Sequence, residues 1–135
     1  MGKTIEKIAE SRGHSIVLKV DEHSTSYDIT IADISIDFSI PSVAFDNITH
    51  SLKNKIPVVS GTTGWLDKID LAKEICIDND AGFIYASNFS LGVNIFFELN
   101  EHLAKMIANL TDYKVRMEEI HHTQKLDAPS GTAIT

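Results

Sequence analysis

Residues suited to proton transfer gather near the end of the chain, where His121, His122 and Lys125 fall within five positions. A turn-forming Asp-Ala-Pro sequence follows, and after it comes the run Ser130-Gly131-Thr132. Histidine titrates near neutral pH and is the side chain most often used to transfer protons. Backbone N–H groups in such a turn can point outward together and bind an anion. The spacing therefore predicts a site that holds and protonates an anionic small molecule.

The same residue types also have purely structural uses, because paired histidines are common on surfaces and Pro-Ser-Gly-Thr is ordinary turn and helix-capping chemistry. A metal site is not expected. Adjacent residues on an extended segment point in opposite directions, so His121 and His122 are poor joint ligands for one ion.

The run Glu-x-x-His-His-x-x-Lys-x-Asp-Ala-Pro-Ser-Gly-Thr-Ala, which begins at Glu118, resembles the 4-hydroxy-tetrahydrodipicolinate (dihydrodipicolinate) reductases of bacterial lysine and diaminopimelate synthesis. A match over so many fixed positions is far more specific than a short motif. The resemblance implies an oxidoreductase that reduces a cyclic dicarboxylate with NADH or NADPH. It assigns His121 as the acid/base residue and Lys125 as a second proton donor. His122, Gly131 and Thr132 would hold a substrate carboxylate.

Hydrophobic periodicity predicts alternating strands and helices ahead of this run. Strands are expected at 14–20, 34–38, 57–60, 83–86 and 113–120. Helices are expected at 2–12, from Pro41 with Ala44, Ile48 and Leu52 on one face, at 67–76 and at 91–110. In an open sheet of this kind, ligands bind at the carboxyl ends of the strands.

The resemblance assigns cofactor contacts to loops at those strand ends. It names Gly61, Thr62 and Thr63 after one strand and Ala86, Ser87, Asn88 and Phe89 after another, with Met1 as the remnant of a glycine loop. The segment 37–39 also resembles its counterpart in the family and would line the same crevice. Asp21, at the end of the strand expected at 14–20, would bind the adenosine ribose and favours NADH over NADPH, because a carboxylate repels a 2′-phosphate.

The expected fold is α/β, a Rossmann-like parallel sheet followed by the start of an α+β substrate and oligomerisation domain. Residues 1–89 would form a partial dinucleotide-binding domain and 90–135 the beginning of the catalytic domain. Family members are about twice as long, so the resemblance implies that the chain lacks the first strand with its glycine loop and the rest of the second domain. The intact family forms a homotetramer. The region 90–135 is therefore expected to aggregate unless self-association covers its apolar surface.

Composition narrows the class of partner. The 135 residues are 43% hydrophobic and carry a formal charge of -7, which disfavours nucleic acid and anionic membrane surfaces. The single cysteine, Cys76, cannot form an internal disulfide, and there is neither a signal-peptide pattern nor a membrane-spanning run. A cytoplasmic location is expected.

Two further interpretations stay open from the sequence. In the first, the chain is a catalytically inactive α/β fragment that associates with itself or with a full-length partner. Alternatively, Gly2-Lys3-Thr4 would be the tail of a phosphate-binding loop of a nucleotide hydrolase, whose first glycine would precede residue 1.

Overall fold

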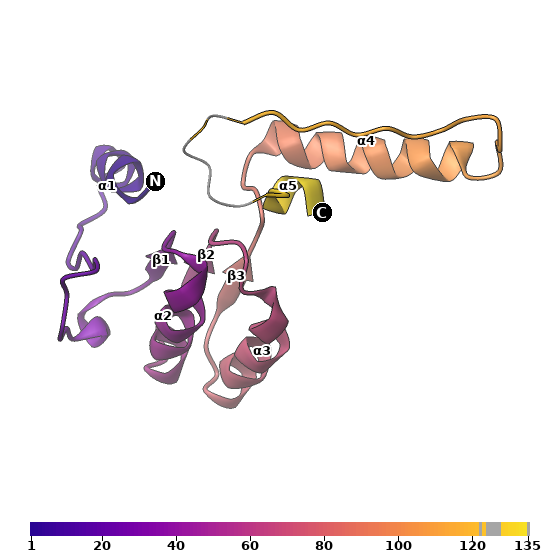
Figure 1. Ribbon diagram of the computed structural model, residues 1–135. Helices are drawn as coiled ribbons and strands as arrows, with labels where there is room; N and C mark the ends of the chain where they lie inside the picture. Colours follow the sequence, from indigo (N-terminus) through magenta and orange to yellow (C-terminus); the bar gives the residue numbers. More distant parts are fainter. Residues whose placement is uncertain (122, 124–127, 135) are drawn as a thin grey trace. The chain divides into compact units, whose positions relative to one another are not determined.

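The computed structural model describes residues 1–121, 123 and 128–134, and its helices and strands are labelled in Figure 1. The chain divides into two compact units, Met1–Tyr85 and Ala86–Thr135, which are described separately. In the described part of the chain, no helix is long and apolar enough to cross a membrane.

The first unit is built on a three-stranded parallel sheet in the order β1-β2-β3. Its strands are β1 (Ser35–Asp37), β2 (Val58–Ser60) and β3 (Phe83–Tyr85). The register pairs Asp37 with Ser60 and Ser60 with Tyr85, so the three strands end level with one another. The loops that follow β1 and β2 therefore leave the same edge of the sheet.

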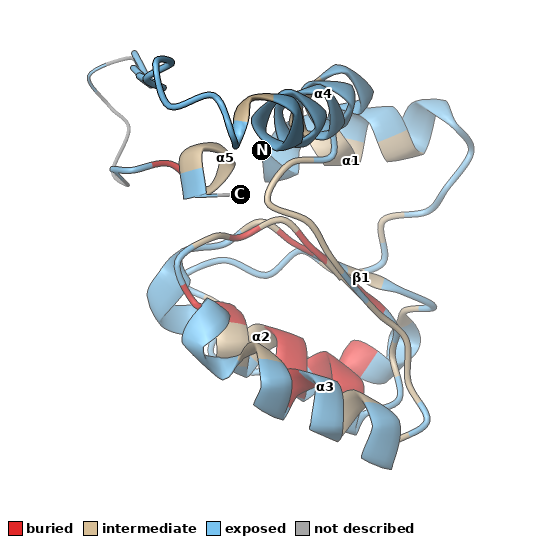
Figure 2. Ribbon diagram, turned by 90° about the vertical axis from the view of Figure 1, so that its right-hand side faces the viewer, coloured by how far each residue is buried: buried red, intermediate tan, exposed pale blue. Residues whose placement is uncertain are grey.

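Helices α2 (Pro41–Lys53) and α3 (Ile69–Asp78) pack side by side against one face of this sheet (Figure 1). Pro41 is the first helical residue of α2, where its missing N–H costs nothing. Ala44, Ile48 and Leu52, spaced four residues apart, are fully buried. Figure 2 shows buried residues in red on α2. They form one hydrophobic core with Val58, Trp65 and Ala72. The helix predicted from this spacing is confirmed.

Three helices end in the same hydrogen-bonding pattern. After α1 (Gly2–Ser11), the N–H of Gly13 donates to Glu10 and that of His14 to Ala9, and Gly13 has a φ of 83°. This is the Schellman arrangement, which satisfies the last carbonyls of a helix. Lys55 (φ 62°) after α2 and Asp80 (φ 50°) after α3 occupy the position that Gly13 occupies after α1.

Two short 3-10 turns complete the first unit. The turn η1 (Ile29–Ile31) begins where the Asp28 carboxylate accepts hydrogen bonds from the N–H and hydroxyl of Thr30. These bonds hold the pKa of Asp28 below its usual range, and the bond from the Thr30 hydroxyl has the larger effect. The turn η2 (Leu66–Lys68) leads from Trp65 directly into α3.

The second unit contains α4 (Leu91–Ile107) and the short helix α5 (Gly131–Ile134). Ser90 caps α4 by accepting a hydrogen bond from the N–H of Val93 at 3.5 Å. No residue of α4 is buried, although its sequence carries an apolar face. The helix predicted at 91–110 is thus confirmed, and its apolar face is exposed, as expected for this region.

The strands predicted at 14–20 and 113–120 are wrong. In 14–20 only Ile16 and Leu18 are half-buried, and 113–120 are exposed throughout. The structure assigns neither segment to a strand. A β-strand requires a hydrogen-bonded neighbour, and the three-stranded sheet contains neither segment. Alternation predicts the faces of a strand but says nothing about its partner.

The architecture is therefore α/β with a parallel sheet, as predicted, although the sheet has three strands and lacks the one predicted at 14–20. The described residues of the second unit form helices and extended segments without a strand.

Candidate functional site

The level ends of β1 and β2 are joined by a hydrogen-bond network around Asp37. Its carboxylate is 8% exposed and accepts hydrogen bonds from the Ser60 hydroxyl at 3.1 Å and the Thr62 hydroxyl at 2.6 Å. Asn47 of α2 donates to the other carboxylate oxygen at 3.4 Å. One buried side chain thus ties together two strand ends and a helix.

The turn after β2 contains Gly61, Thr62 and Thr63, the residues expected to contact the cofactor. The N–H of Gly61 donates to the Asp37 carbonyl at 3.0 Å, which extends the pairing of β1 and β2 by one bond. A Cβ on Gly61 would lie 2.5 Å from Cζ of Phe38 and closer still to Cε1. Any larger residue at position 61 would therefore have to displace the Phe38 ring.

Thr62 and Thr63 differ in their surroundings. Thr62 is buried, and its carbonyl accepts a hydrogen bond from Trp65 Nε1 at 2.7 Å. Thr63 is half-buried, and its hydroxyl takes part in no hydrogen bond with the described residues. The turn is consequently held from inside through Thr62, while Thr63 remains available to a ligand.

Trp65 supports this turn from the core. Its ring makes an edge-on contact with Tyr85 at a centroid distance of 5.8 Å and also lies against Phe45 and Phe83. The Tyr85 hydroxyl is buried without a hydrogen-bond partner among the described residues, and burial raises the pKa of Tyr85.

The two other cofactor candidates of the first unit lie in exposed positions. Met1 precedes α1 as its cap residue. The Asp21 carboxylate accepts hydrogen bonds from the N–H of His23 at 3.0 Å and from the Ser24 hydroxyl at 3.1 Å, so it closes its own turn. The prediction that Asp21 ends a strand is wrong, because 14–20 is not a strand.

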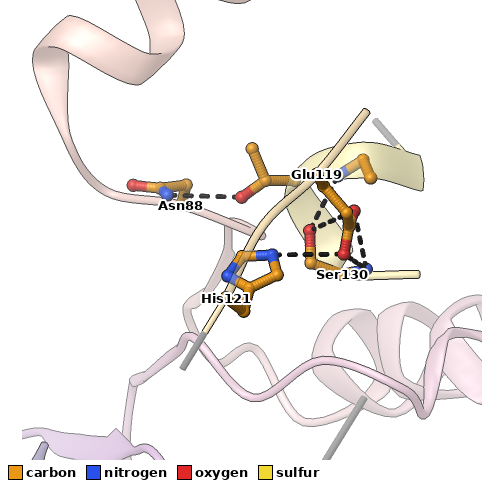
Figure 3. Close-up of polar contacts among 6 residues, drawn as sticks. Asn88, Glu119, His121 and Ser130 are labelled. Atoms are coloured by element: carbon orange, nitrogen blue, oxygen red, sulfur yellow. Dashed lines mark hydrogen bonds and ion pairs between the residues drawn. The ribbon is translucent and has the colours of Figure 1, made fainter. Parts of the chain in front are cut away.

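The segment Ala86, Ser87, Asn88 and Phe89 follows β3 in the chain and belongs to the second unit. Ala86, Ser87 and Asn88 are half-buried, and Phe89 is exposed. Asn88 Nδ2 lies 3.4 Å from Thr132 Oγ1 of α5 (Figure 3). A residue expected at the cofactor thereby contacts one expected at the substrate. Gly131, another substrate candidate, is half-buried beside Thr132.

Glu119 is the centre of the second unit's polar cluster (Figure 3). Its Oε1 atom lies 3.1 Å from His121 Nε2 and accepts a hydrogen bond from the Ser130 N–H, also at 3.1 Å. Its Oε2 atom accepts from the Ser130 hydroxyl at 3.2 Å. A carboxylate on one ring nitrogen fixes the orientation of a histidine. The arrangement suits His121 to proton transfer through its other nitrogen.

His122 and Lys125, predicted to bind the substrate carboxylate and to donate a proton, lie outside the described residues. Within the described ranges, no group of three or more His, Cys, Asp or Glu side chains is placed to hold a metal ion.

Sequence reasoning did not single out Asp37 and Ser60 individually, although both are polar residues at the last position of a strand. A polar residue at the carboxyl end of a parallel strand lies at the edge where such sheets bind ligands, and this position could have identified both residues. Ser130 was recognised only as part of the turn, whereas it is buried and bonded to Glu119.

Two family models match the chain in order. The model described as "Dihydrodipicolinate reductase, N-terminus" matches residues 1–89, and that described as "Dihydrodipicolinate reductase, C-terminus" matches residues 92–135. The first match includes Gly2-Lys3-Thr4, so the comparisons give no support to a nucleotide hydrolase.

Two curated relatives carry the printed name 4-hydroxy-tetrahydrodipicolinate reductase. The protein of Christiangramia forsetii is 60% identical over 137 residues, which cover 100% of this chain and 57% of the relative. The protein of Methanocaldococcus jannaschii is 40% identical over 107 residues, covering 78% of this chain and 38% of the relative. The chain thus spans less than two thirds of the length of these relatives.

Proposed function

Because the chain belongs to the dihydrodipicolinate reductase family, we propose that it carries out the reduction of 4-hydroxy-tetrahydrodipicolinate to tetrahydrodipicolinate in lysine and diaminopimelate biosynthesis. The reductant is NADH or NADPH. The observation that carries the proposal is the 60% identity to a reductase along the whole of this chain. Residues 1–89 supply the cofactor-binding part and 90–135 the substrate-binding part.

The first unit fits a nicotinamide cofactor. The turn of Gly61, Thr62 and Thr63 lies where open α/β sheets bind ligands, at the carboxyl ends of parallel strands. Its conformation is held by Asp37 and Trp65, which leaves Thr63 to the ligand. A bound nicotinamide supplies the hydride, while the protein aligns the reactants. Met1 and the segment 86–89 complete the proposed cofactor contacts.

The second unit supplies the proton and the anion contacts. His121, held by Glu119, delivers the proton, and Lys125 is a second cationic donor. His122 with Gly131 and Thr132 binds a carboxylate of the substrate. Donors that stabilise charge arising during a reaction commonly contribute about 2.7–4 kcal/mol each. Asn88, bonded to Thr132, orders the loop in which the substrate contacts lie.

The preferred cofactor in this proposal is NADH. The Asp21 carboxylate is exposed and ordered by its own turn, and a fixed negative charge repels the 2′-phosphate of NADPH. Replacing Asp21→Asn is expected to raise the affinity for NADPH relative to that for NADH. An unchanged ratio of the two dissociation constants would remove Asp21 from the cofactor site.

Self-association belongs to the same proposal. Large apolar side chains of α4 are more than half exposed, among them Leu91, Phe96, Leu99 and Leu103. Contiguous apolar surface of this kind marks protein contacts. The proposed assembly is a homo-oligomer, the tetramer that the family resemblance implies.

The deciding experiment follows the absorbance of NADH with freshly generated 4-hydroxy-tetrahydrodipicolinate. The chain is compared with the Christiangramia forsetii reductase as a positive control, and binding of NADH and NADPH is measured in parallel. Turnover by both proteins is the expected result.

The other outcomes are distinct. Cofactor binding without turnover favours the second candidate, an inactive α/β protein that retains its ligand. If the control turns over but this chain binds neither NADH nor NADPH, the proposed function is wrong for this chain.

A further inference from the structure

Asp37 is a buried carboxylate for which the described residues provide no cationic partner within ion-pair distance. It is the last residue of β1 and lies opposite Ser60, the last residue of β2. Its hydrogen-bond donors are the hydroxyls of Ser60 and Thr62 and the amide of Asn47. Burial of a carboxylate is costly unless donors satisfy it. A polar network of this kind is expected where a particular backbone geometry must be maintained.

The Thr62 hydroxyl links Asp37 to the loop that follows β1. It donates to Asp37 at 2.6 Å and accepts a hydrogen bond from the Ser39 N–H at 2.8 Å. The loop after β1 and the turn after β2 are thereby joined through one side chain. Hydrogen bonds to an ionised acceptor are short and strongly directional, so they fix position as well as adding energy.

Thr62 has little left to offer a ligand through its side chain. Its hydroxyl is used as donor and acceptor, and its carbonyl accepts from Trp65 Nε1. The residue is also 5% exposed. The Gly61 N–H is likewise used, because it donates to the Asp37 carbonyl. What the turn offers a ligand is therefore Thr63, whose position is fixed by these contacts.

We infer that Asp37 is a positioning residue for cofactor binding, acting through Thr62 to hold the Gly61–Thr63 turn in its ligand-binding conformation. Thr62 contributes as a brace, and its hydroxyl faces Asp37 and not the cofactor. The inference rests on the proposed function, because it takes the nicotinamide cofactor as the ligand of this turn.

A purely structural role for Asp37 has a matched control at the opposite end of the same strand. The Ser35 hydroxyl donates to the Ser51 hydroxyl at 2.9 Å, joining the start of β1 to α2. Ser51 is 2% exposed. Ser51→Ala therefore removes this partly buried hydrogen bond between strand and helix. It also removes the bond from the Ser51 hydroxyl to the Asn47 carbonyl inside α2, but none of the hydrogen bonds made by the turn or by the Asp37 carboxylate.

The test measures the dissociation constants of NADH and NADPH for Asp37→Asn, Thr62→Val, Thr62→Ser and Ser51→Ala, together with their thermal stability. Binding is measured at a temperature at which circular dichroism shows each variant folded. Asp37→Asn and Thr62→Val are expected to weaken binding about tenfold or more, as loss of hydrogen bonds to a charged group implies. Thr62→Ser, which keeps the hydroxyl, recovers most of that loss. Ser51→Ala is expected to lower the thermal stability. It should change the two dissociation constants less than about twofold, which is a binding free energy of about 0.4 kcal/mol.

The outcomes separate this inference from the proposed function. If the unmodified chain binds the cofactor and Asp37→Asn binds equally well, the inference is wrong and the function stands. It is also wrong if Ser51→Ala weakens binding as much as Asp37→Asn does, because general destabilisation then explains both. If Asp37→Asn does not fold, Thr62→Val against Thr62→Ser decides alone. Absence of cofactor binding by the unmodified chain overturns both proposals.

Discussion

Glu119 Oε1 lies 3.1 Å from His121 Nε2, and the same carboxylate accepts hydrogen bonds from the N–H and hydroxyl of Ser130 (Figure 3). One side chain thus couples the proposed proton donor to the residue that begins the α5 segment. With Nε2 engaged by the carboxylate, Nδ1 is the ring nitrogen left to exchange a proton with a substrate. Glu119 is therefore expected to matter for catalysis without touching the substrate.

Replacing Glu119→Gln removes an acceptor that serves both His121 and Ser130. The amide has the same size but places an NH₂ group against one of the donors. We expect kcat/KM to fall about 10- to 100-fold, which corresponds to the worth of hydrogen bonds to a charged group. Steady-state reductase kinetics test this, and the ring chemical shifts of His121 report the lost contact independently of turnover.

Glu118→Gln is the matched control for that experiment. Glu118 is the neighbouring residue, exposed, and 3.8 Å from Arg116 at the surface. Exposed ion pairs contribute little, so the control should behave as the unmodified chain. Equal losses in the two variants would contradict a positioning role for Glu119.

A second prediction concerns the glycine of the cofactor turn. Gly61→Ala places a methyl group against the Phe38 ring, 2.5 Å from Cζ. Overpacking of this kind typically destabilises a protein by about 1–3 kcal/mol. Urea unfolding should show the loss, and a second substitution, Phe38→Leu, should recover part of it. Gly2→Ala is the control, because nothing lies within 4 Å of its added Cβ. Unchanged stability of Gly61→Ala would mean that the ring moves aside freely.

The sequence predicted the central part of the fold well, for a physical reason. Ala44, Ile48 and Leu52 recur at helical spacing because one face of α2 must be buried, and all three are fully buried. The strands at the three sheet positions were predicted by the same logic. The strands wrongly predicted at 14–20 and 113–120 have the right alternation but no hydrogen-bonded neighbour, and pairing is a tertiary property that alternation does not encode.

Helix ends and site geometry show a similar limit. Gly13 predicted the end of α1, because glycine readily adopts a positive φ. Lys55 and Asp80 adopt the same conformation without that signal. In the candidate site, the resemblance supplied Gly61, Thr62 and His121, whereas the donors that gather around Asp37 become evident only when strand register places Ser60 opposite it.

The third prediction concerns the exposed face of α4. Leu99 and Leu103 lie four residues apart on this helix and are 63% and 53% exposed. We expect the chain to associate as its concentration rises, and Leu99→Gln combined with Leu103→Gln to reduce that association without changing the net charge. Size-exclusion chromatography with light scattering measures the effect, with Asn100→Gln as the control. A chain that stays monomeric at every concentration and binds no hydrophobic dye would contradict the prediction.

The last prediction concerns the buried hydroxyl of Tyr85. It has no hydrogen-bond partner among the described residues, while its ring packs edge-on against Trp65. A buried polar group without a partner costs about 1–3 kcal/mol. Tyr85→Phe keeps the ring and removes the hydroxyl, so the free energy of unfolding at neutral pH should rise by about 1 kcal/mol. Tyr113→Phe, at a residue that is 68% exposed, is the control.

The same tyrosine gives this prediction a pH dependence. Burial raises the pKa of Tyr85 above its ordinary value of 10.0, so the folded protein favours the neutral phenol. Below pH 10 the phenol is neutral in both the folded and the unfolded chain, so it adds no pH dependence to the free energy of unfolding. As the pH rises from there through the folded-state pKa, the free energy of unfolding falls, because the unfolded chain ionises first. The stability gained in Tyr85→Phe should therefore increase further above about pH 10. Urea unfolding across this range measures the difference, and parallel curves for the two proteins would show that the hydroxyl is solvated in the folded state.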